Sequence, residues 1–175
     1  SEKDAHSMYA TITPSASWRL VQALNTLKDR DGKILIDGFY DGIKPVSQAE
    51  KDALKTDVFN ESAVKEILGI EKFIGDAHGE DLLMSLYYKP TCNICGITAG
   101  YQGEGSKTVL PGKASCKIDF RLVPGQDPNR ILELLRAHLD KHGFEDIKIE
   151  YHSGCLAHRS DPEAPFCKAV IRSMK

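Results

Sequence analysis

The polar residues best suited to chemistry lie where a glycine-rich turn runs into a strand. Residues 103–111 read GEGSKTVLP and place Lys107 and Thr108 just ahead of a run that ends at Arg121. The turn has the glycines and the lysine of a phosphate-binding loop, but the earlier glycine is missing and no helix follows. An isolated arginine at a strand end, like the isolated His6 near the start, is typical of a solvated surface residue. The pattern alone therefore leaves their role open.

Three groups of cysteine and histidine residues could be read as metal or redox sites. Cys92 and Cys95 have the Cys-x-x-Cys spacing, but residues three apart on a strand point to opposite faces, which favours ordinary packing. His138 and His142 lie four residues apart on a predicted helix, but they lack an obvious third ligand. The histidine and cysteine residues of the tail match no compact zinc pattern; they are His152, Cys155, His158 and Cys167. No nucleophile triad can be argued from spacing, so the residues alone indicate no self-contained active site.

The strand and helix after the glycine-rich turn are the clearest predicted elements. From residue 114 apolar and polar side chains alternate up to Leu122, which predicts a strand over residues 114–123 with one buried face and one polar face that ends in Arg121. Pro124 and Gly125 end it. Asp127 is a good N-cap and Pro128 suits the first helical position, which predicts a helix over residues 128–142 closed by Gly143.

The rest of the chain predicts an α+β domain over residues 1–175. A helix is expected between Pro14 and Asp29, a helical insertion over residues 47–88 and a strand over residues 92–101. A final strand over residues 147–151 and the start of a helix over residues 165–175 follow. This order fits a ferredoxin-like β-α-β-β-α-β antiparallel sheet with two helices on one face, whose first strand is missing or lies in the short N-terminal segment. Because that strand is internal in such a sheet, its absence would leave a groove, a different pairing or a borrowed strand.

Composition and charge narrow the class of protein. The chain has 175 residues and a formal net charge of −2, with acidic and basic residues interspersed, which argues against nucleic acid or an anionic membrane as a partner. The polar face of the strand from residue 114 also lacks the exposed aromatics of an RNA-binding sheet. No apolar run is long enough to span a bilayer and no signal-peptide pattern is present. Five cysteines fit reduced thiols and a cytoplasmic location.

Three strings carry a resemblance to a known family. They are KDAHSMY at residues 3–9, DGKILIDGFYD at residues 31–41, and the long stretch over residues 88–128 that contains GSKTVLPG and RLVPG. They resemble the lid, or dimerisation, domain of the zinc-dependent metallopeptidases that include carnosinase-type dipeptidases, peptidase V and aminoacylase. The resemblance covers nearly the whole chain. It implies a lid inserted into a catalytic domain that carries two zinc ions, with residues 165–175 beginning the return to that domain.

The resemblance also implies roles for three residues. His6 matches the lid histidine that reaches the partner subunit's zinc site and stabilises the developing oxyanion. Thr108 and Arg121 match lid positions that hold the carboxylate end of the substrate, as two arms of one clamp. The expected partners are a second copy, through a homodimer formed by the lid, and a peptide or N-acyl amino acid. Zinc is expected in the parent enzyme, and none in this chain, which alone would be inactive.

A second interpretation belongs to another class of protein. A ferredoxin-like domain of this size could be a free-standing dimerisation or small-molecule-binding module. The coding sequence on either side decides between the two, because zinc-ligand motifs upstream and a histidine downstream would favour the peptidase.

Overall fold

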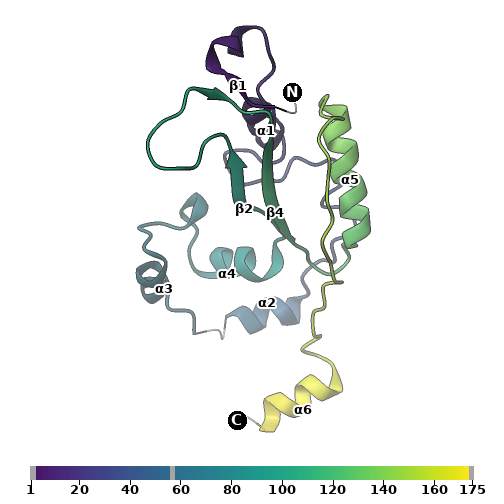
Figure 1. The fold of residues 1–175 in the computed structure, drawn as a ribbon. Helices are drawn as coiled ribbons and strands as arrows, with labels where there is room; N and C mark the ends of the chain where they lie inside the picture. Colours follow the sequence, from purple (N-terminus) through teal and green to yellow (C-terminus); the bar gives the residue numbers. More distant parts are fainter. Residues whose placement is uncertain (1–2, 56–57, 174–175) are drawn as a thin grey trace. The chain divides into compact units, whose positions relative to one another are not determined.

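A computed structural model describes residues 3–55 and 58–173 of the chain (Figure 1). The residues form two compact units, each with segments from several parts of the sequence. The first unit comprises residues 1–39, 91–121 and 131–152, and the second comprises residues 40–90, 122–130 and 153–175. Helices and strands occur together, so the α+β class is confirmed.

The main sheet of the first unit is an antiparallel pair, β2 (Thr91–Ala99) and β4 (Ala114–Arg121). Its register pairs Cys92 with Phe120 on the inner face, where Phe120 meets the fully buried ring of Phe39 with centroids 5.8 Å apart. The register shifts between Ile94 and Gly96, so Cys95 is an extra residue at a bulge. Cys92 is buried and Cys95 is exposed, as the alternation of strand faces predicts.

A second antiparallel pair joins the N-terminal segment to the glycine-rich stretch. β1 (Ala5–His6) pairs with β3 (Val109–Leu110), and the short 3-10 helix η1 (Ser7–Thr11) follows β1. Only two residues of each strand take part, which explains why no alternating pattern indicated this pairing.

Helices α1 (Ala16–Asn25) and α5 (Pro128–Lys141) complete the first unit. Ser15 caps α1, its side chain accepting from the backbone N–H of Trp18, and α1 packs against β4. Asp127 caps α5, its Oδ1 accepting from the backbone N–H groups of Asn129 and Arg130 at 2.9 and 3.0 Å. The apolar stripe of α5 supplies buried Ile131, Leu135 and Leu139.

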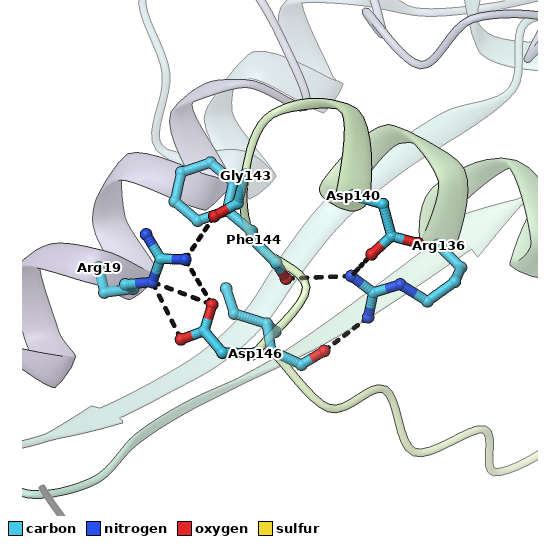
Figure 2. A network of polar contacts seen from close by, with 7 residues as sticks. Arg19, Arg136, Asp140, Gly143, Phe144 and Asp146 are labelled. Atoms are coloured by element: carbon cyan, nitrogen blue, oxygen red, sulfur yellow. Dashed lines mark hydrogen bonds and ion pairs between the residues drawn. The ribbon is translucent and has the colours of Figure 1, made fainter.

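Two arginines hold the chain that leaves α5 (Figure 2). Arg19 pairs with the carboxylate of Asp146 through its Nε at 2.9 and 3.0 Å and also donates to the carbonyl of Gly143. Arg136 donates to the carbonyls of Phe144 at 3.0 Å and Ile147 at 2.6 Å. These side chains give the end of α5 and the start of the next segment the hydrogen bonds that a helix or ladder would otherwise supply.

The strand predicted over residues 147–151 is wrong. Among the described residues this segment joins no ladder, although Ile147 and Ile149 are half-buried and Lys148 and Glu150 exposed, as in a strand with one covered face. The ferredoxin-like plan explains the failure, because the last strand of that plan pairs with the first. The described residues contain no such first strand, and β1 pairs with β3 instead.

The second unit holds the helical insertion, whose predicted helices are confirmed. α2 (Gln48–Leu54) starts with the Ser47–Glu50 capping box, α3 (Glu61–Leu68) follows the cap Asn60, and the 3-10 helix η2 (Ile74–Asp76) precedes α4 (Gly79–Tyr88). The tail folds as α6 (Pro165–Ser173); the last two residues predicted for it lie outside the described part of the chain. Within the described residues, no helix is both long and apolar enough to cross a membrane.

Buried Glu50 ties the tail to this insertion. Its Oε1 lies 2.6 Å from Nε of Arg159, and Arg159 also donates to the carbonyl of Pro45 at 3.0 Å and lies over the ring of Tyr88. The turn after β4 is fixed in the same unit by a close backbone approach. The N–H of Lys44 donates to the carbonyl of Pro124 at 3.0 Å, so this part of the RLVPG motif has a packing reason.

Candidate functional site

The backbone of His6 is held by the pairing of β1 with β3 and by the residue that precedes β3. It pairs with Val109 across β1 and β3, and the N–H of Ser7 donates to the carbonyl of Thr108 at 3.3 Å. Asp4 strengthens the same junction, because its Oδ1 accepts from the N–H of Gly112 at 3.0 Å. The structure therefore brings His6 and Thr108 together, with both residues exposed.

A hydrogen bond to the ring of His6 determines which ring nitrogen carries the proton. Its Nδ1 accepts from the backbone N–H of Met8 at 3.2 Å and so caps η1. In a neutral imidazole one nitrogen accepts and the other carries the proton, so Nε2 is the donor. His6 thus offers an N–H group at an exposed position, and its backbone neighbours that of Thr108.

Glycine is required at position 112 for this arrangement. A Cβ added to Gly112 would lie 2.6 to 2.8 Å from the backbone atoms of Lys3. The N-terminal segment can therefore pass across the turn before β4 only because this residue has no side chain. The close approach brings Asp4 within reach of the Gly112 N–H and sets the start of β1.

A cavity of about 600 Å³ lies beside this junction, but it does not include His6 or Thr108. Its walls come from η1, the start of α1 and the glycine-rich stretch, and they include Ser7, Trp18, Tyr101 and Lys107. Ser7 and Lys107 each adjoin one of the two candidate residues in sequence.

Arg121 occupies the opposite end of β4. Seven residue steps separate it from Ala114, which at the usual rise of a strand is about 23 Å of chain. Its backbone N–H donates to Oγ1 of Thr91 at 3.3 Å, and its side chain is 83% exposed. Within one chain, the structure therefore does not bring Arg121 to His6 and Thr108.

Arg121 has charged and polar neighbours on the outer face of the sheet. Its Nε lies 3.9 Å from Oδ2 of Asp119. The other oxygen, Oδ1, accepts from Nδ2 of Asn93 at 3.1 Å and from the thiol of Cys95 at 2.7 Å. These bonds, first that of Cys95 and then that of Asn93, hold the pKa of Asp119 below its usual value. No sequence pattern indicates this group, because the bulge and the long connection over residues 100–113 hide the register of β2 against β4.

The pair His138 and His142 is explained by packing. His138 is buried and its Nε2 lies 3.0 Å from Oγ1 of Thr26, while its ring centroid lies 4.4 Å from that of His142 with the rings tilted by 40°. Over residues 3–55 and 58–173, no three His, Cys, Asp or Glu side chains are grouped so that they could hold a metal ion.

Comparison with known proteins shows which family this chain belongs to. The family model described as the peptidase dimerisation domain matches residues 1–147. The chain belongs to the peptidase dimerisation domain family. The predicted resemblance to the lid of metallopeptidases is thereby confirmed, and the α+β fold agrees with it.

Relatives of the domain are peptidases. Over 140 residues it is 34% identical to the Beta-Ala-His dipeptidase of Mus musculus, and over 138 residues 31% identical to the Cys-Gly metallodipeptidase of Saccharomyces cerevisiae. These matches take in 79% and 78% of this chain but 28% of each relative. The domain thus spans little more than a quarter of the length of these relatives.

The solved structures that resemble this chain are also peptidases. The M20 family metallo-carboxypeptidase of Sulfolobus solfataricus superposes with a TM-score of 0.93 at 36% identity, over 99% of this chain and 45% of that one. Human carnosine dipeptidase 1 gives a TM-score of 0.74 at 30% identity, over 81% of this chain and 30% of that one.

Proposed function

We propose that this domain is the lid of a dizinc peptidase that hydrolyses dipeptides, short peptides or N-acyl amino acids. Membership of the dimerisation domain family supports this, as do relatives that are metallodipeptidases and a metallo-carboxypeptidase. In this proposal the domain contributes hydrogen-bond donors and a positive charge to an active site completed by other parts of the protein.

The observation that carries the proposal is the fixed Nε2–H donor of His6. Amide hydrolysis passes through a tetrahedral intermediate whose oxygen becomes negative, and a donor already in place stabilises that charge without reorganisation. Met8 fixes the ring by its bond to Nδ1, and the β1–β3 pairing fixes the backbone. In this proposal Thr108, whose carbonyl accepts from the N–H of Ser7, offers its hydroxyl to a carboxylate oxygen of the same substrate.

In the proposal Arg121 supplies the second arm, and its distance from Thr108 within one chain supports an origin in a different copy. A guanidinium fork binds a carboxylate through two parallel hydrogen bonds. Because the length of β4 separates Arg121 from Thr108, the two arms of one clamp would come from two chains. Each active site of the dimer then uses His6 and Thr108 of one copy and Arg121 of the other.

The free edge of β2 is the surface that would join the copies. Within the described residues β2 pairs with β4 alone, and its nine residues include no charged side chain and no proline. Ile94 and Ile97 on it are 44% and 52% exposed. Edge strands of monomeric proteins are usually protected by charges or proline, so this edge suits pairing with the same edge of a second copy about a twofold axis.

Zinc does not fit the part of the chain that the structure describes, since those residues contain no group of ligands for a metal ion. In the proposal the zinc ions are therefore held elsewhere in the longer protein. The contribution of this domain is confined to binding and orienting the substrate and to donating the proton of His6 Nε2 in a hydrogen bond.

The test is a chimeric enzyme in which this domain replaces the matching stretch of the Sulfolobus metallo-carboxypeptidase. We expect it to hydrolyse peptides or N-acyl amino acids, and His6→Ala to lower kcat by roughly tenfold or more. Arg121→Ala should mainly raise KM. His152→Ala, an exposed histidine outside the site, is the matched control. Undiminished kinetics in both His6→Ala and Arg121→Ala would overturn the proposal.

A further inference from the structure

The outer face of the β2–β4 sheet carries a polar relay that ends at Arg121, and the proposed function gives no role to its other members. Asn93 lies directly opposite Asp119 in the register, and Thr91 lies opposite Arg121. Asp119 and Arg121 are two residues apart on β4, so both side chains leave the same face. The relay runs from β2 through the carboxylate of Asp119 to the guanidinium of Arg121.

The bulge at Cys95 completes the relay. A regular strand would place Cys95 opposite Lys117, one step beyond Asp119 on the outer face. The shift in register makes Gly96 the partner of Lys117 and leaves Cys95 unpaired in the ladder. The thiol then reaches Oδ1 of Asp119 at 2.7 Å, next to the bond from Asn93 at 3.1 Å.

The two oxygens of Asp119 therefore contact different partners. Oδ1 is occupied by two donors from β2, which restrict rotation of the carboxylate. Oδ2 lies 3.9 Å from Nε of Arg121, on the inner side of the guanidinium. This separation is an ion-pair contact and is too long for a hydrogen bond, so the carboxylate attracts the Nε side of the guanidinium and leaves its terminal nitrogens available for a second carboxylate. Without that contact, a side chain that is 83% exposed would sample many rotamers.

We propose that Asp119 is a positioning residue that orients Arg121 toward the substrate's carboxylate, with Asn93 and Cys95 fixing Asp119 from the neighbouring strand. This rests on the proposed function, in which Arg121 binds that carboxylate. Asp119 does not touch the substrate. Its effect passes through Arg121, so it influences binding of the substrate and leaves the chemical step unchanged.

The kinetic test is a double-mutant cycle in the chimeric enzyme. Asp119→Asn keeps the size of the side chain and removes its charge, and we expect it to raise KM by roughly threefold to tenfold with kcat nearly unchanged. In an Arg121→Ala background the same substitution should leave KM unchanged. Ser115→Ala, on the same face of β4 but outside the relay, is the matched control. An equal effect of Asp119→Asn in both backgrounds, or none in either, overturns the proposal.

The relay itself can be tested by a measurement that does not depend on enzyme activity. The hydrogen bond to Asp119 raises the pKa of the Cys95 thiol, so Asp119→Asn should increase the thiolate fraction. Alkylation by iodoacetamide, read by peptide mass spectrometry, should become roughly twofold to fivefold faster at Cys95. Exposed Cys155 in the same molecule is the internal control. An unchanged rate at Cys95 relative to Cys155 contradicts the relay.

The two measurements separate the possible failures. If Arg121→Ala has no kinetic effect while Cys95 becomes more reactive in Asp119→Asn, the relay exists and the assignment of Arg121 to the substrate is wrong. If Arg121→Ala raises KM and Cys95 does not respond, Arg121 binds substrate and Asp119 does not position it.

Discussion

The backbone N–H of Ser7 donates to the carbonyl of Thr108 at 3.3 Å, which joins the first residues of the chain to its glycine-rich stretch. This single contact places His6 beside Thr108. The pairing is short, and it depends on the room left by Gly112.

Substituting Gly112 tests that dependence. Gly112→Ala introduces a Cβ that would lie 2.6 Å from the backbone of Lys3, so β1 must move away from β3. We expect hydrogen exchange at the amide of Ser7 to accelerate, since its acceptor is displaced. Gly96→Ala is the control, because a Cβ there meets no atom within 4 Å. Equal protection of Ser7 in both variants would show that Gly112 does not set the position of β1.

Gly125 in the RLVPG motif should be the most sensitive glycine of the second unit. Its φ is +101° and an added Cβ would lie 1.9 Å from the carbonyl oxygen of Gly42. Gly125→Ala should lower the free energy of unfolding by about 2–4 kcal/mol in urea denaturation. Gly143→Ala is the matched control, with φ of +77° and open space around the Cβ, and should cost only about 1 kcal/mol. Similar losses in the two variants would contradict the role of the close approach.

The burial of His138 makes stability depend on pH. Burial lowers the pKa of His138, assisted by the nearby charge of His142, and Thr26 donates its hydroxyl to Ala23 so that it can accept from Nε2. The unfolded chain therefore binds a proton more readily than the folded one. As the pH falls below the ordinary histidine range, near 6.5, stability should decrease.

Urea unfolding at about pH 7.5 and about pH 5.5 measures this dependence. His138→Gln retains a donor for Thr26 and cannot become charged, so its loss of stability between the two conditions should be smaller. His152→Gln, at an exposed site, should behave as the unmodified chain. A pH dependence unchanged in His138→Gln would assign the effect to other groups.

The uncharged edge of β2 predicts that the domain associates with itself. Ile97→Lys places a charge on an edge strand and should shift the isolated domain from dimer to monomer in sedimentation measurements. Ile67→Lys on α3 makes the same chemical change at a residue that is 82% exposed, and should leave the oligomeric state unchanged. Dissociation by both substitutions, or by neither, would place the contact elsewhere.

The sequence predicted the elements whose signals are local. Ser47 and Glu50 form their capping box, and the alternation from Ala114 to Arg121 gives a strand, because caps and pleats depend on residues a few positions apart. The prediction of a strand over residues 147–151 was wrong. Its side chains do alternate between half-buried and exposed, but within the described residues no neighbouring strand pairs with it. A strand needs a ladder, and no local pattern reports whether one is present.

The candidate site was predictable only in part. The identities of His6, Thr108 and Arg121 came from the motifs that carry the family resemblance. Their arrangement did not, since the β1–β3 pairing involves two residues on each side and joins distant parts of the chain. The relay of Asn93, Cys95 and Asp119 depends on a bulge, which shifts the register without a sequence pattern that announces it.

Mixing two impaired variants of the chimeric enzyme, His6→Ala and Arg121→Ala, tests the central claim most directly. If His6 of one copy and Arg121 of the other serve one active site, a heterodimer of His6→Ala and Arg121→Ala has one intact site and one that lacks both groups. Random reassortment of equal amounts should restore roughly one quarter of the unmodified activity. If both residues of one chain serve the same site, every site lacks one group, and the mixture should be no more active than the separate variants. That result would contradict a clamp shared between two copies.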